Sequence, residues 1–365
     1  MKILLVLTSL EMGGAERVVI DLADHLVYVG HEVKIVYLVD IRKIMPRREE
    51  VELICLGMNK NPLSFMLALF RLRRVVCMWG PDVVHCHQFH AIFLSRMLRL
   101  FAPVPKLVSS AHNTVDGGRF RRIIYKLSDR LSDVNTNVSC EAVDNFLKFG
   151  CFSRQKTLVM HNSIDVERFA FSPSEREKLR RFYNIDNDTV LFLAVGRLHT
   201  QKDYPSLLQA FNKVLKANKS SVLFIVGDGP LEKEIKSLAD NFNLSQKVCF
   251  LGLRADIPSL MSACDVFVLS SAWEGFGLVV AEAMACERLV VATNSGGVKE
   301  VLGDSGYLVP PRQPSALSEA MLKASTLNPN DRGELGRRAR LRVVEFYSSE
   351  ALSEKWIEIY QRVIN

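Results

Sequence analysis

The sequence lacks the long apolar runs and paired cysteines that mark several large classes of protein. No window approaches the roughly 18 uninterrupted apolar residues that a membrane-spanning helix needs, although 48% of the 365 residues are hydrophobic. The apolar run at the N-terminus is followed by no small-residue cleavage site, so it predicts a first buried strand and not a secretory signal. The eight cysteines form no C-x-x-C pair, which favours buried, reduced thiols. These absences together predict a folded cytoplasmic protein.

Nucleic-acid-binding motifs are also missing, although the chain is basic. The net charge of +7 is concentrated, because residues 61–130 hold 11 basic and 3 acidic side chains whereas residues 171–365 hold 24 and 23. A local basic excess of this kind suits either nucleic acid or an anionic membrane surface. The basic residues are not interleaved with aromatic platforms on which bases could stack. We therefore expect no nucleic-acid partner.

Short β-branched-rich runs alternate with amphipathic helical segments along most of the chain. The predicted strands are 3–10, 33–38, 51–56, 83–87, 106–111, 134–139, 157–161, 190–195, 222–226, 248–251, 265–270, 289–293 and 307–309. Repeated βα units of this length predict parallel, doubly wound sheets. We expect two Rossmann-like domains at 1–168 and 188–347, a charged linker with a short helix at 169–187, and a last helix at 348–365 that crosses back to the first domain. Ligands of such sheets bind at the carboxyl ends of the strands.

The stretch from 265 to 301 carries the most specific motif. An apolar strand ends in a polar loop, and two glycines interrupt the chain directly before a run of good helix formers. Free backbone N–H groups and the positive end of a helix dipole then meet at the sheet's carboxyl edge, where they can hold a diphosphate. The residues predicted to form this cradle are Gly275, Phe276, Gly277 and Leu278. Glu274 and Glu282 flank the turn, and their carboxylates would accept hydrogen bonds from sugar hydroxyls but repel phosphate.

The spacing E-x7-E with G-F-G inside it, followed by N-S-G-G-V-K-E at 294–300, resembles the donor-site motif of glycosyltransferase family 4. This resemblance implies the GT-B fold, in which two Rossmann-like doubly wound domains face each other across a cleft. It also implies a retaining enzyme that moves a hexose or N-acetylhexosamine from a nucleotide diphosphate to a glycan. The family's usual donors make a UDP-sugar the first expectation and a GDP-sugar the second. Glu274 would orient the donor sugar and Glu282 would bind the ribose.

Other loops match the family pattern at the carboxyl ends of the predicted strands. His112 ends the fifth strand and matches the family histidine near the donor sugar, so we expect it to act in catalysis beside Glu274. Arg197 and Lys202 flank a strand–helix loop, and their charges suit the leaving diphosphate, so we expect no metal or other cofactor. The remaining residues predicted to approach the nucleotide or the acceptor are Gly13, Gly14, Gly196, Gly227, Asp228 and Gly229.

Two patterns that could suggest a metal site are interpreted otherwise. His85 and His87 share one face of a strand while the cysteine between them points away, and no second ligand group is spaced to complete a site. Residues 186–188 have the D-x-D form that metal-dependent glycosyltransferases use, but they lie in a charged segment before a strand, so we expect a turn. Asn162 begins a segment similar to the family's N-G-[IV]-D turn, in which Ser163 replaces the usual glycine.

The basic charge of the first half of the chain indicates binding to an anionic membrane surface, where a lipid-linked acceptor would lie. Four apolar residues of segment 63–78 form one helical stripe, namely Phe65, Leu69, Leu72 and Val76. Arg71, Arg73 and Arg74 lie near the end of this stripe, and residues 119–126 add a second basic stretch. Such helices bind anionic membranes by apolar burial and charge, although the stripe could instead pack on the sheet.

We therefore expect peripheral binding to the inner face of the cytoplasmic membrane, with a polyprenyl-diphosphate-linked sugar as acceptor in the synthesis of a surface polysaccharide such as lipopolysaccharide. Two alternatives stay open. One is a GT-B glycosyltransferase with a soluble acceptor, and the other is a non-catalytic binder of nucleotide sugars or nucleic acid.

Overall fold

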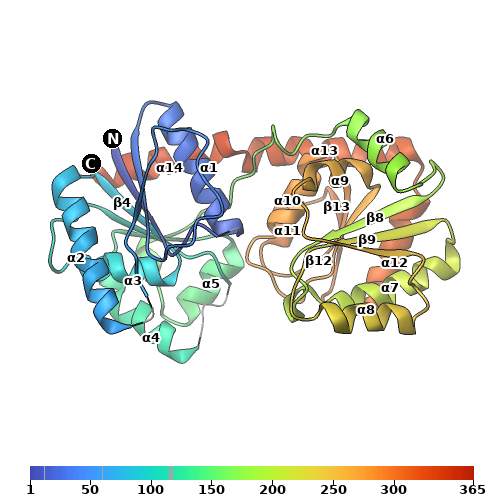
Figure 1. Ribbon diagram of the computed structural model, residues 1–365, viewed down its shortest axis with the longest axis horizontal. Coiled ribbons are helices and arrows are strands. Elements are labelled where there is room, and N and C mark those ends of the chain that lie inside the picture. Colours follow the sequence, from blue (N-terminus) through green and yellow to red (C-terminus); the bar gives the residue numbers. More distant parts are fainter. Residues whose placement is uncertain (12, 60, 115–117) are drawn as a thin grey trace. The chain divides into compact units, whose positions relative to one another are not determined.

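The computed structural model describes residues 1–365 except 12, 60 and 115–117. The chain divides into two compact units (Figure 1). The first comprises Met1–Ser163 together with Ser349–Asn365, and the second comprises Ile164–Ser348. Each unit is built on a β-sheet with helices packed around it.

The first sheet has seven strands in the order β3-β2-β1-β4-β5-β6-β7, and all their pairings are parallel. The strands are β1 (Lys2–Leu7), β2 (Glu32–Tyr37), β3 (Glu52–Cys55), β4 (Val83–His87), β5 (Leu107–Ser110), β6 (Val134–Asn137) and β7 (Thr157–Val159). The helices are α1 (Gly14–Tyr28), α2 (Pro62–Trp79), α3 (Phe89–Leu98), α4 (Arg119–Ser128), α5 (Cys140–Lys148) and α14 (Ser349–Ile364), with 3-10 turns η1 (Asp129–Leu131) and η2 (Arg154–Lys156). The strand order reverses between β1 and β4, so the carboxyl ends of these two strands form the topological switch point.

The second sheet has six parallel strands in the order β10-β9-β8-β11-β12-β13. The strands are β8 (Val190–Val195), β9 (Ser221–Val226), β10 (Val248–Gly252), β11 (Val266–Leu269), β12 (Leu289–Thr293) and β13 (Gly306–Val309). The helices are α6 (Pro173–Phe182), α7 (Tyr204–Ala217), α8 (Glu232–Asn241), α9 (Ile257–Ala263), α10 (Leu278–Ala285), α11 (Val298–Leu302), α12 (Pro314–Thr326) and α13 (Pro329–Tyr347), with the 3-10 turn η3 (Thr200–Lys202). Its switch point lies between β8 and β11.

The predicted fold class is confirmed. Each of the thirteen predicted strands is present within one or a few residues of its predicted bounds, and the central ones are buried throughout, as in β4 and β11. Strands that are buried on both faces read as continuous apolar runs, which is why the sequence pattern located them.

The charged segment at 169–187, predicted as a linker with a short helix, contains helix α6, which packs on α9 in the second unit. Two of its three arginines are held in ion pairs in the second unit, whereas Arg181 is exposed. Arg176 lies 2.6 Å and Arg180 3.0 Å from the carboxylate of Asp265, which precedes β11. These ion pairs fix α6 on the second unit, so part of the segment's charge belongs to a partly buried cluster around Asp265.

The C-terminal helix α14 belongs to the first unit, where it packs beside α1 (Figure 1). Trp356 and Tyr360 of this helix are buried in the same cluster as Ile3 and Leu5 of β1. The last residues of the chain therefore complete the core that its first strand begins.

The apolar stripe of α2, which could face a membrane or pack on the sheet, points inward. Leu69, Leu72 and Val76 are buried in the core of the first unit, and Phe65 is packed against it. Of the two alternatives stated for this stripe, packing on the sheet is the one that the structure shows. Within the described parts of the chain, helices are too short or too polar to cross a membrane.

Candidate active site

Glu274 and Lys202 meet at the carboxyl edge of the second sheet. Glu274 lies in the loop between β11 and α10, and Lys202 ends η3 after β8. The Lys202 Nζ atom is 2.6 Å from Oε1 of Glu274, and the hydroxyl of Ser271 donates to the same oxygen at 2.6 Å. The glutamate is 7% exposed. The residue predicted to orient the sugar and one predicted to bind the diphosphate thus form a single, largely buried ion pair.

The loop after β12 braces the backbone of Glu274. Gly296 has a φ of +58°, and a Cβ at this position would overlap the carbonyl oxygen of Glu274. The amide of Gly297 donates to the carbonyl of Gly275 at 3.1 Å, and the hydroxyl of Thr293 donates to the carbonyl of Ser271 at 2.6 Å. The motif N-S-G-G therefore supports the glutamate loop from behind, and its glycine is required by close backbone approach.

The first turn of α10 follows directly. Gly277 caps the helix with a φ of +88° and offers no side chain to the free N–H groups, which suits an anion at this position. The ring of Phe276 is buried against Tyr347, with ring centres 5.6 Å apart. Phe276 is thus a packing residue, and only its backbone can take part in the predicted cradle. Glu282 lies half-buried on the same helix.

Two further loops of the second unit lie against each other. The amide of Leu198 donates to the carbonyl of Asp228 at 2.7 Å, and a Cβ at Gly227 would overlap the carbonyl oxygen of Gly196. The hydroxyl of Tyr204 donates to that same carbonyl at 2.8 Å. Burial, and secondarily the negative charge of Glu274, raise the pKa of Tyr204. The loops that contain Arg197 and Gly229 are therefore brought together at one edge, with Arg197 exposed.

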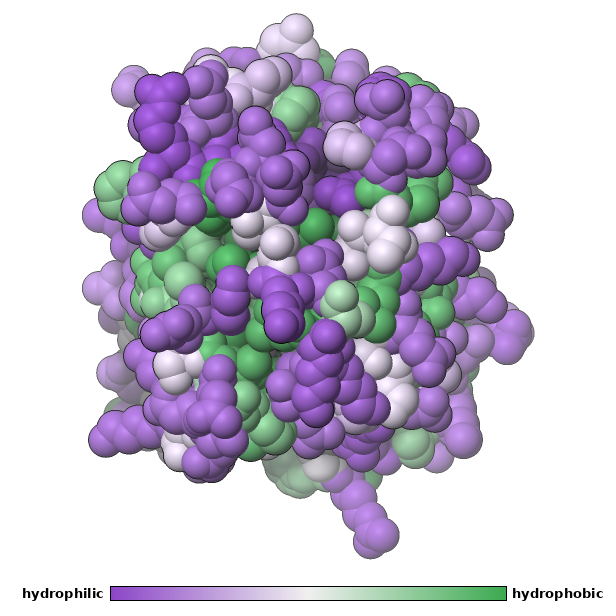
Figure 2. Space-filling view, turned by 90° about the vertical axis from the view of Figure 1, so that its right-hand side faces the viewer, coloured by the Kyte–Doolittle hydropathy of each residue, from purple (hydrophilic) through white to green (hydrophobic). Residues whose placement is uncertain are grey.

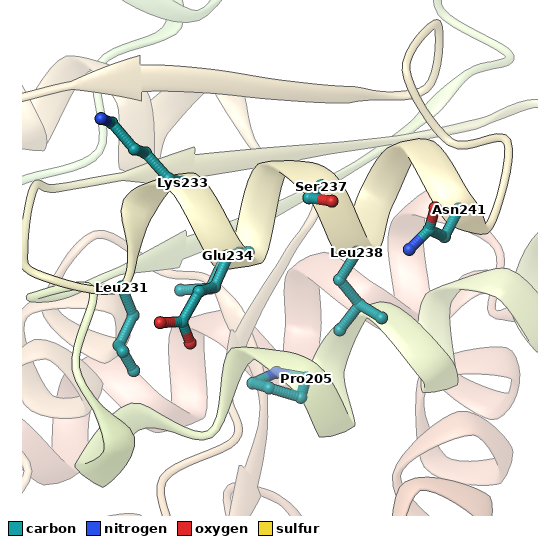
Figure 3. Close-up of a pocket in the computed structure, with 8 residues that line it drawn as sticks. Pro205, Leu231, Lys233, Glu234, Ser237, Leu238 and Asn241 are labelled. Carbon is teal, nitrogen blue, oxygen red and sulfur yellow. The ribbon is translucent and has the colours of Figure 1, made fainter.

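A hollow between α7 and α8 lies outside this edge (Figure 3). It is lined mainly by side chains of α8, with Pro205 of α7 opposite Glu234 and Leu238. None of the predicted site residues lines it, so we assign it no part in the candidate active site.

In the first unit, three histidines form a chain of contacts that ends at α14. The His87 Nδ1 atom is 3.0 Å from Nε2 of His112, the rings of His85 and His87 are 3.9 Å apart, and His85 Nδ1 is 2.7 Å from the hydroxyl of Tyr360. The predicted shared face of His85 and His87 is thereby confirmed. Burial lowers the pKa of His112 to about 4 and holds the pKa of the other two well below their usual range.

The Nε2 atom of His112 is therefore engaged by His87. His112 is the residue that was predicted to contact the donor sugar. Gly13 and Gly14 begin α1 at the neighbouring edge of β1. Among the residues that the structure describes, no three His, Cys, Asp or Glu side chains are grouped as metal ligands. Asp186 accepts a hydrogen bond from the amide of Thr189 at 2.7 Å, as a turn residue does. Ser163 does not have a positive φ, so the turn after Asn162 forms without a glycine.

Sequence reasoning missed the hydroxyls and amides that hold these residues. Ser271, Thr293, Tyr204 and Gln88 all lie within or next to the motifs, but their types are common and nothing in their spacing distinguishes them. Gln88 carried one weak signal, since it directly follows a predicted strand at the switch point.

The comparisons with known proteins agree with this architecture. The family described as Glycosyltransferase Family 4 matches residues 12–168, and the family described as Glycosyl transferases group 1 matches residues 175–342. The GDP-mannose-dependent monoacylated alpha-(1-6)-phosphatidylinositol monomannoside mannosyltransferase of Corynebacterium glutamicum is 30% identical over 276 residues, which is 71% of either chain. The protein is a glycosyltransferase of the GT-B type. It belongs to glycosyltransferase family 4.

Other relatives differ in what their names say they act on. The N-acetyl-alpha-D-glucosaminyl L-malate synthase of Bacillus anthracis is 26% identical over 369 residues, covering 97% of this chain and 95% of that protein. The UDP-Gal:alpha-D-GlcNAc-diphosphoundecaprenol alpha-1,3-galactosyltransferase of Escherichia coli is 29% identical over 249 residues, covering 66% and 64%. Among solved structures, Anabaena HepE in complex with UDP superposes with a TM-score of 0.86 at 22% identity, over 99% of this chain and 100% of that one, and shows the same fold.

Proposed function

We propose that this protein is a retaining, metal-independent glycosyltransferase that moves a hexose or N-acetylhexosamine from a UDP-sugar to a lipid-linked sugar. The observation that carries this is the ion pair of Lys202 and Glu274 beside the uncapped first turn of α10. One edge of one sheet therefore offers two kinds of group. The carboxylate can accept hydrogen bonds from sugar hydroxyls, and the lysine and the backbone N–H groups can donate to phosphate. A nucleotide-diphosphate sugar needs both kinds of group.

Each side chain has a task in this proposal. Lys202 has three N–H donors, so its bond to Glu274 leaves two for the diphosphate. Arg197 and the amides of Gly277 and Leu278 would add to the stabilisation of the leaving group as negative charge develops on it. Glu274 would accept hydrogen bonds from the sugar, and Glu282 from the ribose. The catalytic role of His112 remains a prediction from the family resemblance. No step in this scheme requires a cation.

The test is a transfer assay with a panel of UDP- and GDP-sugars and one acceptor, N-acetylglucosamine linked by a diphosphate to a short prenyl chain. We expect transfer from a UDP-sugar with retained anomeric configuration. The control is Glu274→Gln, which keeps the shape of the side chain and should lower kcat by about 100-fold. Full activity in Glu274→Gln, or an inverted product, would contradict the proposed mechanism.

The first unit has a surface that fits an anionic membrane, and it differs from the predicted one. The outer face of α2, the chain after α3 and the outer face of α4 expose large apolar side chains. These are Leu63, Met66, Leu67 and Phe70 on α2, Leu100 and Phe101 after α3, and Phe120, Ile123 and Leu127 on α4. Helix α3 packs against both α2 and α4, and Arg73 Nε donates to the carbonyl of Phe101 at 3.1 Å. We call these nine residues the apolar face.

Basic residues accompany the apolar face. Arg74, Arg119 and Lys126 are exposed beside it, and each basic group near an anionic surface contributes about 1 kcal/mol of binding. The side of the molecule seen in Figure 2 also shows apolar residues over its middle, lying between hydrophilic ones. Two of the relatives described above carry diphosphoundecaprenol or phosphatidylinositol in their names. We therefore propose a lipid-linked acceptor and docking of the apolar face on an anionic membrane surface.

Vesicle flotation tests this docking. The protein should float with phosphatidylcholine vesicles that contain phosphatidylglycerol. The fraction of protein that floats should be smaller at high salt. The double variant Phe70→Asp with Phe120→Asp should stay unbound, whereas Leu341→Asp, an equally exposed leucine on α13, should bind as the wild type does. If the wild type also stays unbound, a soluble acceptor would be favoured, as the name of the Bacillus relative suggests. If both proteins float equally, the apolar face is not the docking surface.

A further inference from the structure

Four arginines of the second unit gather around one carboxylate. The Nη2 atom of Arg176 lies 2.6 Å and the Nη1 atom of Arg180 lies 3.0 Å from the carboxylate of Asp265. The Nη1 atom of Arg332 lies 3.6 Å from the same carboxylate. The guanidinium of Arg288 donates to the backbone carbonyl of the residue before Asp265 at 2.8 Å. We call these four arginines and Asp265 the arginine cluster, in which one negative charge faces four positive charges.

The arginine cluster is largely buried at the amino edge of the second sheet. Asp265 directly precedes β11 and accepts a hydrogen bond from the amide of Leu191 in β8 at 2.8 Å. The side chains of Arg180 and Arg332 are only 5% and 13% exposed. Burial, as the main cause, lowers the pKa of Arg332, and the charge of Arg176 adds to this effect. The candidate active site lies at the opposite, carboxyl edge of the same sheet.

Backbone carbonyls at the end of α9 satisfy many of the N–H donors but none of the charge. The Nη1 atom of Arg176 donates to the carbonyls of Ala263 and Cys264 at 2.8 Å and 2.9 Å. These carbonyls are neutral dipoles, so the excess of positive charge persists, and a buried charge is costly without a counter-charge. In the described part of the chain, the Nε atoms of Arg180 and Arg332 are buried without a hydrogen-bond partner. An anion bound here would therefore find both unpaired charge and unused donors.

A hollow of about 430 Å³ lies against the arginine cluster, and Arg176 and Arg180 both line it. The side chain of Arg176 is 27% exposed, so its guanidinium is the part of the cluster that a ligand in the hollow would reach first. Phe171, Pro173 and Ile185 also line the hollow and give it an apolar side. The hollow therefore offers charge for an anionic group and apolar surface for an organic one.

Two acidic residues line the same hollow, but they do not cancel its charge. Glu177 is paired with the exposed Arg181 at 2.6 Å, and the carboxylate of Asp186 accepts a hydrogen bond from the amide of Thr189. When these side chains are counted with the arginine cluster, five arginines face three carboxylates. The excess is two positive charges.

We propose that this hollow is a phosphate-binding site, in which Arg176 and the arginine cluster bind phosphate as the free ion or as the monoester of a small organic molecule. A guanidinium matches phosphate geometry with two parallel N–H donors. A phosphate monoester carries about two negative charges at neutral pH, which equals the excess. The organic part of a monoester would lie on Phe171 and Pro173. The site is separate from the edge that is suited to the donor diphosphate, and it does not rest on the proposed function.

Calorimetric titration of the full chain tests this site, with inorganic phosphate and glucose 6-phosphate as probes in chloride buffer of constant ionic strength. Arg176→Gln should raise the Kd for both probes at least about tenfold, because it removes a charged donor. The matched control is Arg99→Gln in the first unit, since Arg99 is 24% exposed and lies 2.7 Å from Asp133. This control should keep the wild-type Kd. Lys202→Met, which removes a cation from the candidate active site, should keep it as well.

The Arg176→Gln protein should fold, because Asp265 keeps Arg180 and Arg332 as partners, and circular dichroism checks this. If it does not fold, Arg176→Lys retains a cation beside Asp265 and should still raise the Kd several-fold, because it loses the paired donors. Tighter binding of glucose 6-phosphate than of phosphate would identify a monoester as the ligand, and equal affinities would identify the free ion.

Three results would overturn the proposal. One is a wild type that shows no saturable binding of either probe. Another is a wild-type Kd in the folded Arg176 variant. The third is binding that is lost in Lys202→Met but kept in Arg176→Gln, which would place the phosphate at the candidate active site.

Discussion

The ammonium group of Lys202 and the carboxylate of Glu274 lie 2.6 Å apart, although 72 residues separate them in sequence. The side chains of both are mostly buried, at 16% and 9% exposed. Lys202 follows β8 and Glu274 follows β11, so this ion pair shows that the loops after these two strands converge at one edge of the sheet. It also links a group suited to phosphate with a group suited to sugar.

The first prediction concerns this pair. Replacing Lys202 by Met should lower the unfolding free energy by about 3 kcal/mol, since it leaves the carboxylate of Glu274 buried without its cation. The double variant Lys202→Met with Glu274→Gln should lose less than the sum of the two single losses, with a coupling energy of about 1–3 kcal/mol. Urea unfolding of the four proteins measures it. Additive losses would show that the two groups do not depend on each other.

The second prediction compares two glycines that share a left-handed backbone. Gly296 has a φ of 58° and Gly252 one of 64°, but a Cβ would overlap Glu274 only at Gly296 and would meet open space at Gly252. Gly252→Ala should therefore cost only the backbone strain, about 1–2 kcal/mol. Gly296→Ala should cost clearly more and also lower kcat, because the glutamate loop must shift.

Thermal unfolding and the transfer assay together check this comparison. Equal stability losses and unchanged kcat in both variants would mean that the loop after β12 does not position Glu274.

The sequence located the strands and the edges that carry the motifs, because buried parallel strands and glycine turns leave local signals. It did not reveal which face of α2 points inward. Both faces of this helix are apolar, with Leu69 and Leu72 on one side and Leu63 and Phe70 on the other. The periodicity of hydrophobic residues does not show which of two apolar faces is buried, because burial depends on the elements that the rest of the chain packs against the helix.

The contacts of the candidate site depend on tertiary structure in the same way. Lys202 and Glu274 could each be named from the motifs, but their pairing is set by the order of β8 and β11 in the sheet. The ion pairs of α6 could not be predicted for a similar reason, since Asp265 lies 89 residues from Arg176 in the sequence.

The third prediction is a loss of stability in mild acid. Burial keeps His85, His87 and His112 neutral in the folded state, with the pKa of His112 lowered from 6.5 to about 4. The unfolded chain binds these protons near its ordinary pKa, so stability is present above 6.5 and falls as the pH drops toward about 4. Each histidine should contribute a loss of about 1 kcal/mol between about pH 7.5 and about pH 5.5.

Urea unfolding at the two pH values, followed by tryptophan fluorescence, measures this loss. The variant His112→Gln should show a smaller pH dependence by one histidine's share. A wild type whose stability does not change over this range would contradict the assignment of three neutral buried histidines.

The last prediction is that transfer activity survives chelation. The proposed site balances the diphosphate with Lys202, Arg197 and the amides before α10, and electrostatic stabilisation from fixed groups can replace that of a cation. The first aspartate of the D-x-D segment already has protein partners. The carboxylate of Asp186 accepts a hydrogen bond from the amide of Thr189, and the backbone carbonyl of Asp186 accepts one from the guanidinium of Arg180. Transfer in excess EDTA should therefore match that of untreated enzyme, and Asp186→Asn should keep kcat unchanged. Loss of activity in EDTA that manganese restores in the wild type but not in Asp186→Asn would instead make Asp186 a metal ligand, and the proposed roles of Lys202 and Arg197 would have to be given up.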